Sequence, residues 1–114
     1  MKIGAYDIVS LETGRFSLDG GAMFGVVPWV FWSKMNRPDE RQRIELAARC
    51  WLVRGLGRNI LVDDGNGAKW SDKLKDIYKL DVTTGDLLTS LGNVGLAPAD
   101  ITDVILTHLH FDHA

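Results

Sequence analysis

The sequence predicts a mixed α/β (α+β) domain in which two helices cover one face of a mainly antiparallel or mixed sheet. Three observations lead to this class: strand-like segments fill the first half of the chain, two helical patterns follow them, and one apolar strand comes last. The 114 residues allow at most one domain, which could bury a real core. Apolar residues make up 46% of the chain, which is ordinary for a globular protein.

The first elements are short strands separated by turns. Ile3 to Leu11 and Phe16 to Leu18 have strand composition, and the turn signal Glu12–Arg15 lies between them. Asp19-Gly20-Gly21 marks a second turn. We therefore expect two strands here rather than one.

The stretch from Met23 to Trp32 is apolar and aromatic, and Pro28 argues against a continuous central strand in it. Tryptophans this close to a proline favour a loop packed across a surface, where it lines an apolar substrate mouth or forms a homodimer contact. For Val26 and Val27 the core is the preferred position.

A hairpin is the clearest element of the middle of the chain. Arg43 to Arg54 and Asn59 to Asp63 are strands, and the glycine-bearing loop Gly55–Arg58 suits the reversal of an antiparallel pair. Cys50 is expected to be a small buried residue of the first strand. Asp63–Gly67 ends the second strand in a tight loop.

Two helices and a strand complete the pattern. Lys69 to Leu80 carries an apolar stripe at helical spacing, and Ser71-Asp72 suits a helix start. A second helix runs from about Asp86 to Asn93. The last element is the apolar strand Asp103 to Thr107.

The charge and cysteine content exclude several classes of protein. Thirteen basic residues against 15 acidic residues give a net charge of −2, so there is no electrostatic case for a nucleic-acid partner. Cys50 is the single cysteine, which excludes an internal disulfide and a multi-cysteine zinc cluster. The longest apolar stretch, Ala22 to Trp32, is too short to span a bilayer, and no secretory signal follows Met1. We therefore expect a cytoplasmic protein with no membrane partner.

All three histidines of the chain fall within its last seven residues, directly after the apolar strand. Residues two apart in extended backbone project to the same side, so His108 and His110 should converge at the end of the strand. Leu109 and Phe111 should point the other way, into apolar packing. A structure placing these residues in a regular helix would contradict this prediction.

Asp112 and His113 are adjacent, so a turn should aim them at a point next to the first histidine pair. Four imidazole and carboxylate ligands within six residues suit zinc, iron or manganese. The lack of a thiolate ligand argues against a sulfur-rich structural site. His108, His110, Asp112 and His113 are therefore the candidate metal ligands.

Asp63 follows the second hairpin strand and has two open interpretations. Its carboxylate can hydrogen-bond a metal-ligating imidazole and so fix the tautomer of that ring. It can also cap amides of its own turn. The first role requires that the loop after its strand open at the same edge of the sheet as the histidines.

Three segments resemble one known family. Thr107–Ala114 resembles the His-x-His-x-Asp-His signature of the metallo-β-lactamase fold superfamily. Ile60–Gly67 is similar to the strand of that family that ends in an Asp-x-Gly loop, with Asp64 where the family often has Thr or Ser. Leu18–Pro28 resembles the lactonase-like hydrolases of the family. The resemblance spans the whole chain but covers only the first half of such a domain.

This resemblance implies half of an αββα sandwich, with residues 1–114 as the N-terminal part of a single domain truncated just after the motif. It implies that His108 and His110 bind one metal and that Asp112 and His113 bind a second. Each metal would need further ligands, and no histidine follows position 113. Two zinc ions are expected per full-length chain, with iron or manganese as alternatives.

The implied function is that of a metal-dependent, dizinc hydrolase of a small-molecule ester, lactone or related bond, acting through a metal-activated water. Asp112 would be the catalytic residue, orienting the nucleophile and then protonating the leaving group. The alternatives on the same fold are iron-dependent thiol or persulfide oxidation, glyoxalase-type thioester hydrolysis, or an inactive fragment. The 114-residue fragment by itself is expected to be inactive.

Overall fold

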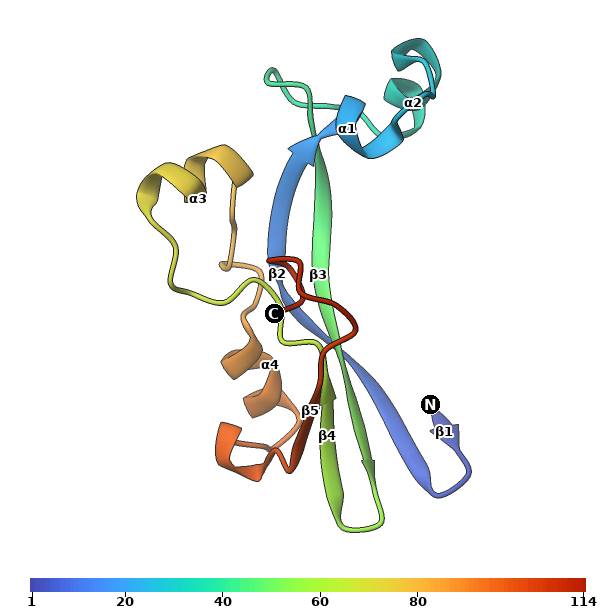
Figure 1. Ribbon diagram of the computed structural model, residues 1–114. Coiled ribbons are helices and arrows are strands. Elements are labelled where there is room, and N and C mark those ends of the chain that lie inside the picture. The colour runs from blue at the N-terminus through green and yellow to red at the C-terminus, as the bar shows by residue number, and fades with distance from the viewer.

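The computed structural model describes residues 1–114 as one five-stranded sheet with helices beside it (Figure 1). The strands lie in the order β1-β2-β3-β4-β5, antiparallel except for the parallel pair β4 and β5. This confirms the predicted α+β class with a mainly antiparallel, mixed sheet. The strands are β1 (Lys2–Ile3), β2 (Tyr6–Asp19), β3 (Arg43–Gly55), β4 (Arg58–Val62) and β5 (Asp103–Ile105). The helices are α1 (Gly20–Phe24), α2 (Trp29–Met35), α3 (Asp72–Tyr78) and α4 (Leu87–Asn93), with a 3₁₀ turn η1 at Pro98–Asp100.

Strand β2 is one continuous strand, so the turn predicted at Glu12–Arg15 is wrong. Glu12 pairs with Arg49 and Arg15 pairs with Ala47, and the register shifts between the two pairs. The turn-like residues are accommodated as a bulge, which bends a strand without ending it. The first chain reversal lies between β1 and β2, where Gly4 has a φ of +57°.

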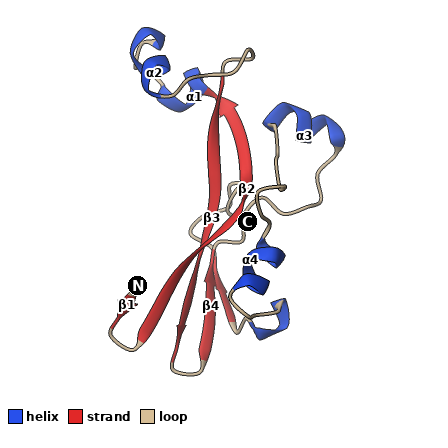
Figure 2. Cartoon of the chain, turned by 180° about the vertical axis from the view of Figure 1, so that it is seen from behind, coloured by secondary structure: helices blue, strands red, loops and turns tan.

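The segment expected to be a loop across a surface is instead two short helices, α1 and α2, which project from the far end of the β2–β3 hairpin (Figure 2). We call residues 20–35 the arm. Trp32 is its buried side chain, stacked on Phe24 with ring centroids 5.1 Å apart. Val26 is 99% exposed and Val27 is also exposed, so the expected core position of both is wrong. Pro28 is the residue before the start of α2, and Arg43 at this end of the hairpin donates hydrogen bonds to the backbone of Asp76 and Ile77 in α3. The homodimer expected through Met23 to Trp32 stays a prediction.

The β3–β4 hairpin lies where the sequence predicts it. Leu56 and Gly57 form its reversal with φ values of 52° and 74°. Positive φ at both central positions is typical of the two-residue turn that matches the twist of antiparallel strands. The turn directs β4 back along β3, so Asp63 follows the end of β4 at the centre of the molecule.

Helices α3 and α4 confirm the two predicted helices, although α3 is only Asp72–Tyr78 within the predicted range 69–80. The Ser71 side chain accepts a hydrogen bond from Leu74 N at the start of α3, and the Asp86 side chain accepts one from Thr89 N at the start of α4. These caps satisfy amides that have no partner within the helix. Both helices lie on the same side of the sheet, toward β2 (Figure 1). None of the helices is long and apolar enough to cross a membrane.

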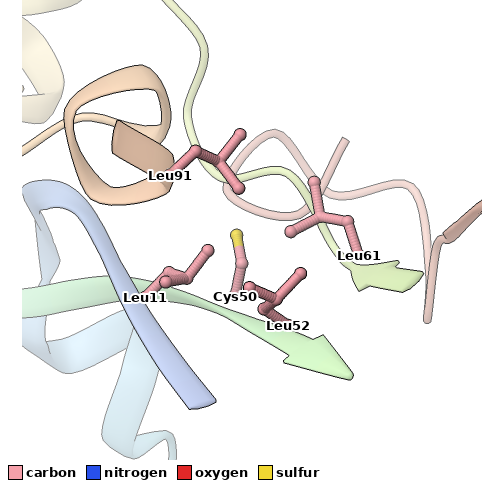
Figure 3. Close-up of a cluster of buried hydrophobic side chains, with 5 residues drawn as sticks. All are labelled: Leu11, Cys50, Leu52, Leu61 and Leu91. Atoms are coloured by element: carbon pink, nitrogen blue, oxygen red, sulfur yellow. The ribbon is translucent and has the colours of Figure 1, made fainter. Parts of the chain in front are cut away.

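The hydrophobic core lies between α4 and the middle of the sheet (Figure 3). Its buried side chains come from β2, β3, β4 and α4, and they are Leu11, Cys50, Leu52, Leu61 and Leu91. The core is small, because 16 of the 114 residues are buried. The radius of gyration of 16.2 Å also exceeds the value of about 13 Å expected for a compact domain of this length.

Cys50 provides a test of this core. Its side chain is 0% exposed, and burial raises the pKa of the thiol to about 11. Because the thiolate is the reactive form, we expect native protein at pH 8 to react with iodoacetamide far more slowly than protein unfolded in urea. Mass spectrometry of the alkylated product measures the two rates, and equal rates would show that the thiol is accessible in the native fold.

The other face of the sheet carries an apolar strip that no helix covers. Trp51 pairs with Val62, and Val62 pairs with Ile105, so the three side chains share one face. Trp51 is 48% exposed and Ile105 is 52% exposed. Along β3, the residues that point to this face alternate with the buried residues of the core. This pattern is expected for a sheet that is covered on one side.

Candidate metal centre

The candidate site begins at the ends of the parallel strands β4 and β5. Asp63 directly follows β4, and its backbone N donates to Ile105 O at 2.8 Å. The next amide, Asp64 N, donates to His113 O at 3.0 Å. Since parallel strands end at the same edge of a sheet, the two loops that carry the polar residues are held against each other.

The motif itself is a loop rather than a strand or a helix. β5 ends at Ile105, two residues before the predicted end at Thr107, because the Asp63 side chain accepts the hydrogen bond of Thr107 N at 2.8 Å. A turn follows, in which His113 N donates to His110 O at 3.0 Å. Leu109 is 81% exposed, so its expected apolar packing is wrong, because it lies in this loop beyond the sheet.

The loop gathers the three imidazole rings. The ring centroids of His108 and His110 are 4.7 Å apart, and those of His108 and His113 are 4.1 Å apart. His108 and His110 are exposed, while His113 is half-buried. The predicted convergence of His108 and His110 is therefore confirmed, and His108 lies close to both other rings.

Asp63 lies directly beside this cluster, as one of its two interpretations requires. Its carboxylate is within 2.8 Å of His113 Nδ1 and accepts the Thr107 hydroxyl at 2.9 Å. Asp63 is 7% exposed and has a φ of 60°. Burial acts to raise the pKa of Asp63, but the hydrogen bonds from His113 and Thr107 outweigh it and hold the pKa below its ordinary value. The carboxylate is therefore ionised at neutral pH.

His113 lies between two carboxylates. Its Nδ1 faces Asp63, and its Nε2 is 3.1 Å from Asp112 Oδ2. The hydrogen bond with Asp63 raises the pKa of His113 above its ordinary value, and the negative charge of Asp112 acts in the same direction. Both imidazole nitrogens of His113 thus face a carboxylate oxygen.

The donor set fits a metal ion in type and in spacing. Zinc binds imidazole nitrogen and carboxylate oxygen at about 2.0–2.2 Å, so two donors of one ion lie about 3 Å apart. The 3.1 Å between His113 Nε2 and Asp112 Oδ2 agrees with this separation. No three His, Cys, Asp or Glu side chains in the structure are grouped to hold one ion. Asp112 and His113 therefore fit as a pair of ligands, which requires additional ligands from elsewhere.

Phe111 anchors the motif loop to the rest of the fold. Its ring lies 4.8 Å from that of Tyr78, 5.3 Å from that of Trp70 and 5.4 Å from that of Phe16, measured between centroids. These partners come from α3, from the loop before it and from β2. The expected apolar packing of Phe111 is confirmed, but its partners carried no signal in the sequence because they are distant along the chain.

A pocket of about 340 Å³ lies beside the site. Thr13, Asp64, Leu87 and Ala114 are among its lining residues. Asp64 Oδ1 and both polar side-chain atoms of Asn66, in the same loop, are buried without a hydrogen-bond partner. Buried polar groups are normally hydrogen-bonded, but these atoms of the loop have no hydrogen-bond partner among the 114 residues.

Comparisons with known proteins agree on one family. The family model described as the metallo-beta-lactamase superfamily matches residues 43–114. A crystal structure of a probable metal-dependent hydrolase from Staphylococcus aureus is 40% identical, with a TM-score of 0.89 over 100% of this chain and 41% of that one. Among the curated proteins, none matches this chain.

More distant structures share the fold. The hydrolase AbOPH of the beta lactamase superfamily is 22% identical, with a TM-score of 0.71 over 99% of this chain and 36% of its own. AidC, a dizinc quorum-quenching lactonase, is 24% identical, with a TM-score of 0.68 over 99% of this chain and 36% of its own. The chain thus spans about two fifths of the length of these solved relatives.

Proposed function

Because this chain belongs to the metallo-beta-lactamase superfamily, we propose that it carries part of the active site of a metal-dependent hydrolase. The observation that supports this most is the gathering of three imidazoles and Asp112 in one loop, with the Asp63 carboxylate behind them. Residues assembled only for packing would not place three exposed or half-buried imidazoles with ring centroids 4.1 and 4.7 Å apart. The 40% identical relative described as a probable metal-dependent hydrolase supports the same interpretation.

His108 and His110 would hold one metal, and Asp112 and His113 would hold a second. We propose zinc for both, because imidazole and carboxylate suit it, with iron and manganese as the alternatives. When bound, the metal would supply a water that loses its proton near neutral pH and would polarise the scissile bond. Asp63 would keep the His113 ring oriented through the hydrogen bond at Nδ1.

Asp112 is the proposed catalytic residue. Its carboxylate would orient the nucleophile and would receive a proton as the carbon–oxygen bond to the nucleophile forms. The same carboxyl would return that proton to the oxygen that leaves when the ester or lactone bond breaks. A small-molecule lactone or ester is the proposed substrate, supported by the resemblance of Leu18–Pro28 to lactonase-like hydrolases and by the fold shared with the lactonase AidC.

We also propose that residues 1–114 are the N-terminal part of a single αββα domain. The exposed strip of Trp51, Val62 and Ile105 supports this, because a second sheet packed on that face would cover it. The unpaired polar atoms of Asp64 and Asn66 support it too, since further chain could supply their partners. The solved relatives have the length that such a second half needs.

We expect residues 1–114 alone to bind zinc weakly and to hydrolyse no lactone, whereas a version extended through the downstream reading frame does both. At most two ligands per metal are present here, and a catalytic zinc site takes three from the protein. The uncovered sheet face should also make the shorter chain aggregate or dimerise. Elemental analysis of bound metal and a lactone hydrolysis assay compare the two versions, with His110→Ala in the longer version as control.

Tight, stoichiometric zinc and chelator-sensitive turnover from residues 1–114 would contradict this prediction. If neither version bound metal, the metallohydrolase proposal would fall with it. The metal found after purification without added metal decides the reaction class, because a single iron would favour thiol or persulfide oxidation over hydrolysis.

A further inference from the structure

We propose that Thr107 is a positioning residue that works with Asp63 to fix which nitrogen of His108 is free to bind a metal. The inference rests on the proposed function, because it takes His108 and His113 to be ligands. The hydrogen bonds that carry it, however, belong to the chain itself and can be measured without metal.

The Thr107 hydroxyl lies between a carboxylate and an imidazole. Its oxygen is 2.9 Å and 3.0 Å from the two carboxylate oxygens of Asp63, and 3.0 Å from His108 Nδ1. An ionised carboxylate can only accept hydrogen bonds, so the single hydroxyl proton goes to Asp63. The threonine oxygen must then accept from His108 Nδ1, which therefore carries the ring proton. His108 Nε2 is left with its lone pair free.

The same carboxylate also contacts His113 directly. His113 Nδ1 lies 2.8 Å from Asp63 Oδ2, and its Nε2 lies 3.1 Å from Asp112 Oδ2, so both nitrogens of this ring face an acceptor. With Thr107 N at 2.8 Å, the Asp63 carboxylate accepts from a backbone amide, a hydroxyl and an imidazole. One buried acidic group thus contacts His113 directly and sets the tautomer of His108 through Thr107, and the centroids of the two rings are 4.1 Å apart.

This arrangement reverses the ordinary preference of a histidine. Neutral imidazole side chains in water carry the proton mainly on Nε2, the nitrogen left free here. The ring nitrogen that is available to a metal is set by the hydrogen bond that the other nitrogen makes. Without the Thr107 hydroxyl, His108 has no partner at Nδ1 and should return to its preference in water. His113 keeps its direct contact with Asp63 and should not change.

The test is nuclear magnetic resonance of the imidazole nitrogens in the metal-free, ¹⁵N-labelled protein expressed from its complete reading frame. Long-range ¹H–¹⁵N correlations distinguish protonated from unprotonated ring nitrogens, at a pH where the rings are neutral. We expect His108 of the native protein to carry the proton on Nδ1. Thr107→Val should move the His108 proton to Nε2 and leave His113 and His110 as they were, whereas Thr107→Ser should keep the native pattern.

Zinc titration of the same variants gives the second readout. Thr107→Val should weaken zinc binding about 10- to 100-fold, the usual cost of losing a group that orients a ligand. Thr107→Ser should stay within a few-fold of the native protein. A native His108 with its proton on Nε2 would overturn the proposal whether or not any variant folds, as would a folded Thr107→Val that keeps the Nδ1 proton. Native tautomers as expected in a protein that binds no zinc would overturn the proposed function while supporting the positioning role of Thr107.

Discussion

Replacing Asp63 by alanine is expected to weaken zinc binding by about 10- to 100-fold and to lower hydrolysis in parallel. The substitution removes the acceptor of His113 Nδ1 and of the Thr107 hydroxyl, so two of the three gathered rings lose their orientation. It also leaves these donors without a partner in a partly buried site, which costs about 1–3 kcal/mol of stability. Isothermal titration with zinc measures the first effect, and urea unfolding measures the second.

Asp64→Ala is the matched control, because it removes the neighbouring carboxylate, which makes no hydrogen bond to a histidine. The control should bind zinc as the native protein does. An Asp63→Ala protein with native zinc affinity would show that Asp63 is only a turn carboxylate, the second interpretation that its position after a strand allows.

The largest effect on stability is expected for Leu52→Ala. Leu52 is 0% exposed and lies in the core cluster with Leu11 and Leu91 (Figure 3). Truncating a buried leucine loses its burial and leaves a cavity, which together cost about 2–5 kcal/mol. Because the core is this small, the free energy of unfolding should be low, and the variant should be largely unfolded at 37 °C.

Leu88→Ala makes the same chemical change at a residue that is 63% exposed on α4, and it should shift the urea midpoint little. Circular dichroism in increasing urea measures both variants. Equal midpoints for the two variants would mean that the cluster around Leu52 is not the centre of the fold.

Local patterns predicted the elements whose determinants are neighbours in sequence. The Gly57 turn and the caps Ser71 and Asp86 each act within four residues, and the structure has a turn or helix start at each of them. The convergence of His108 and His110 was also predicted, but from extended strand backbone, whereas the two rings meet in the loop after β5.

Features that depend on distant partners were missed. The Glu12–Arg15 segment carries turn residues, yet pairing with β3 on both sides keeps it extended through a bulge. Thr107 looked like the last residue of a strand, and its role depends on Asp63, 44 positions earlier. The Phe111 anchor likewise joins rings from three separate segments. Neither periodicity nor spacing within a motif contains such information.

The parallel pairing of β4 and β5 has a consequence for the order in which the protein folds. The β3–β4 ladder closes over a two-residue turn, and such hairpins form within about 1–10 μs. The Asp63–His113 contact spans 50 positions, and the chain must lose the entropy of closing that loop before any contact offsets it. A chain that has formed its hairpin therefore already holds Asp63 at a strand end, while its histidines still move independently of it. The chain therefore becomes able to bind metal only after β5 has paired with β4, which is later than the hairpin forms. This holds although the metal-binding motif itself is only a few residues long.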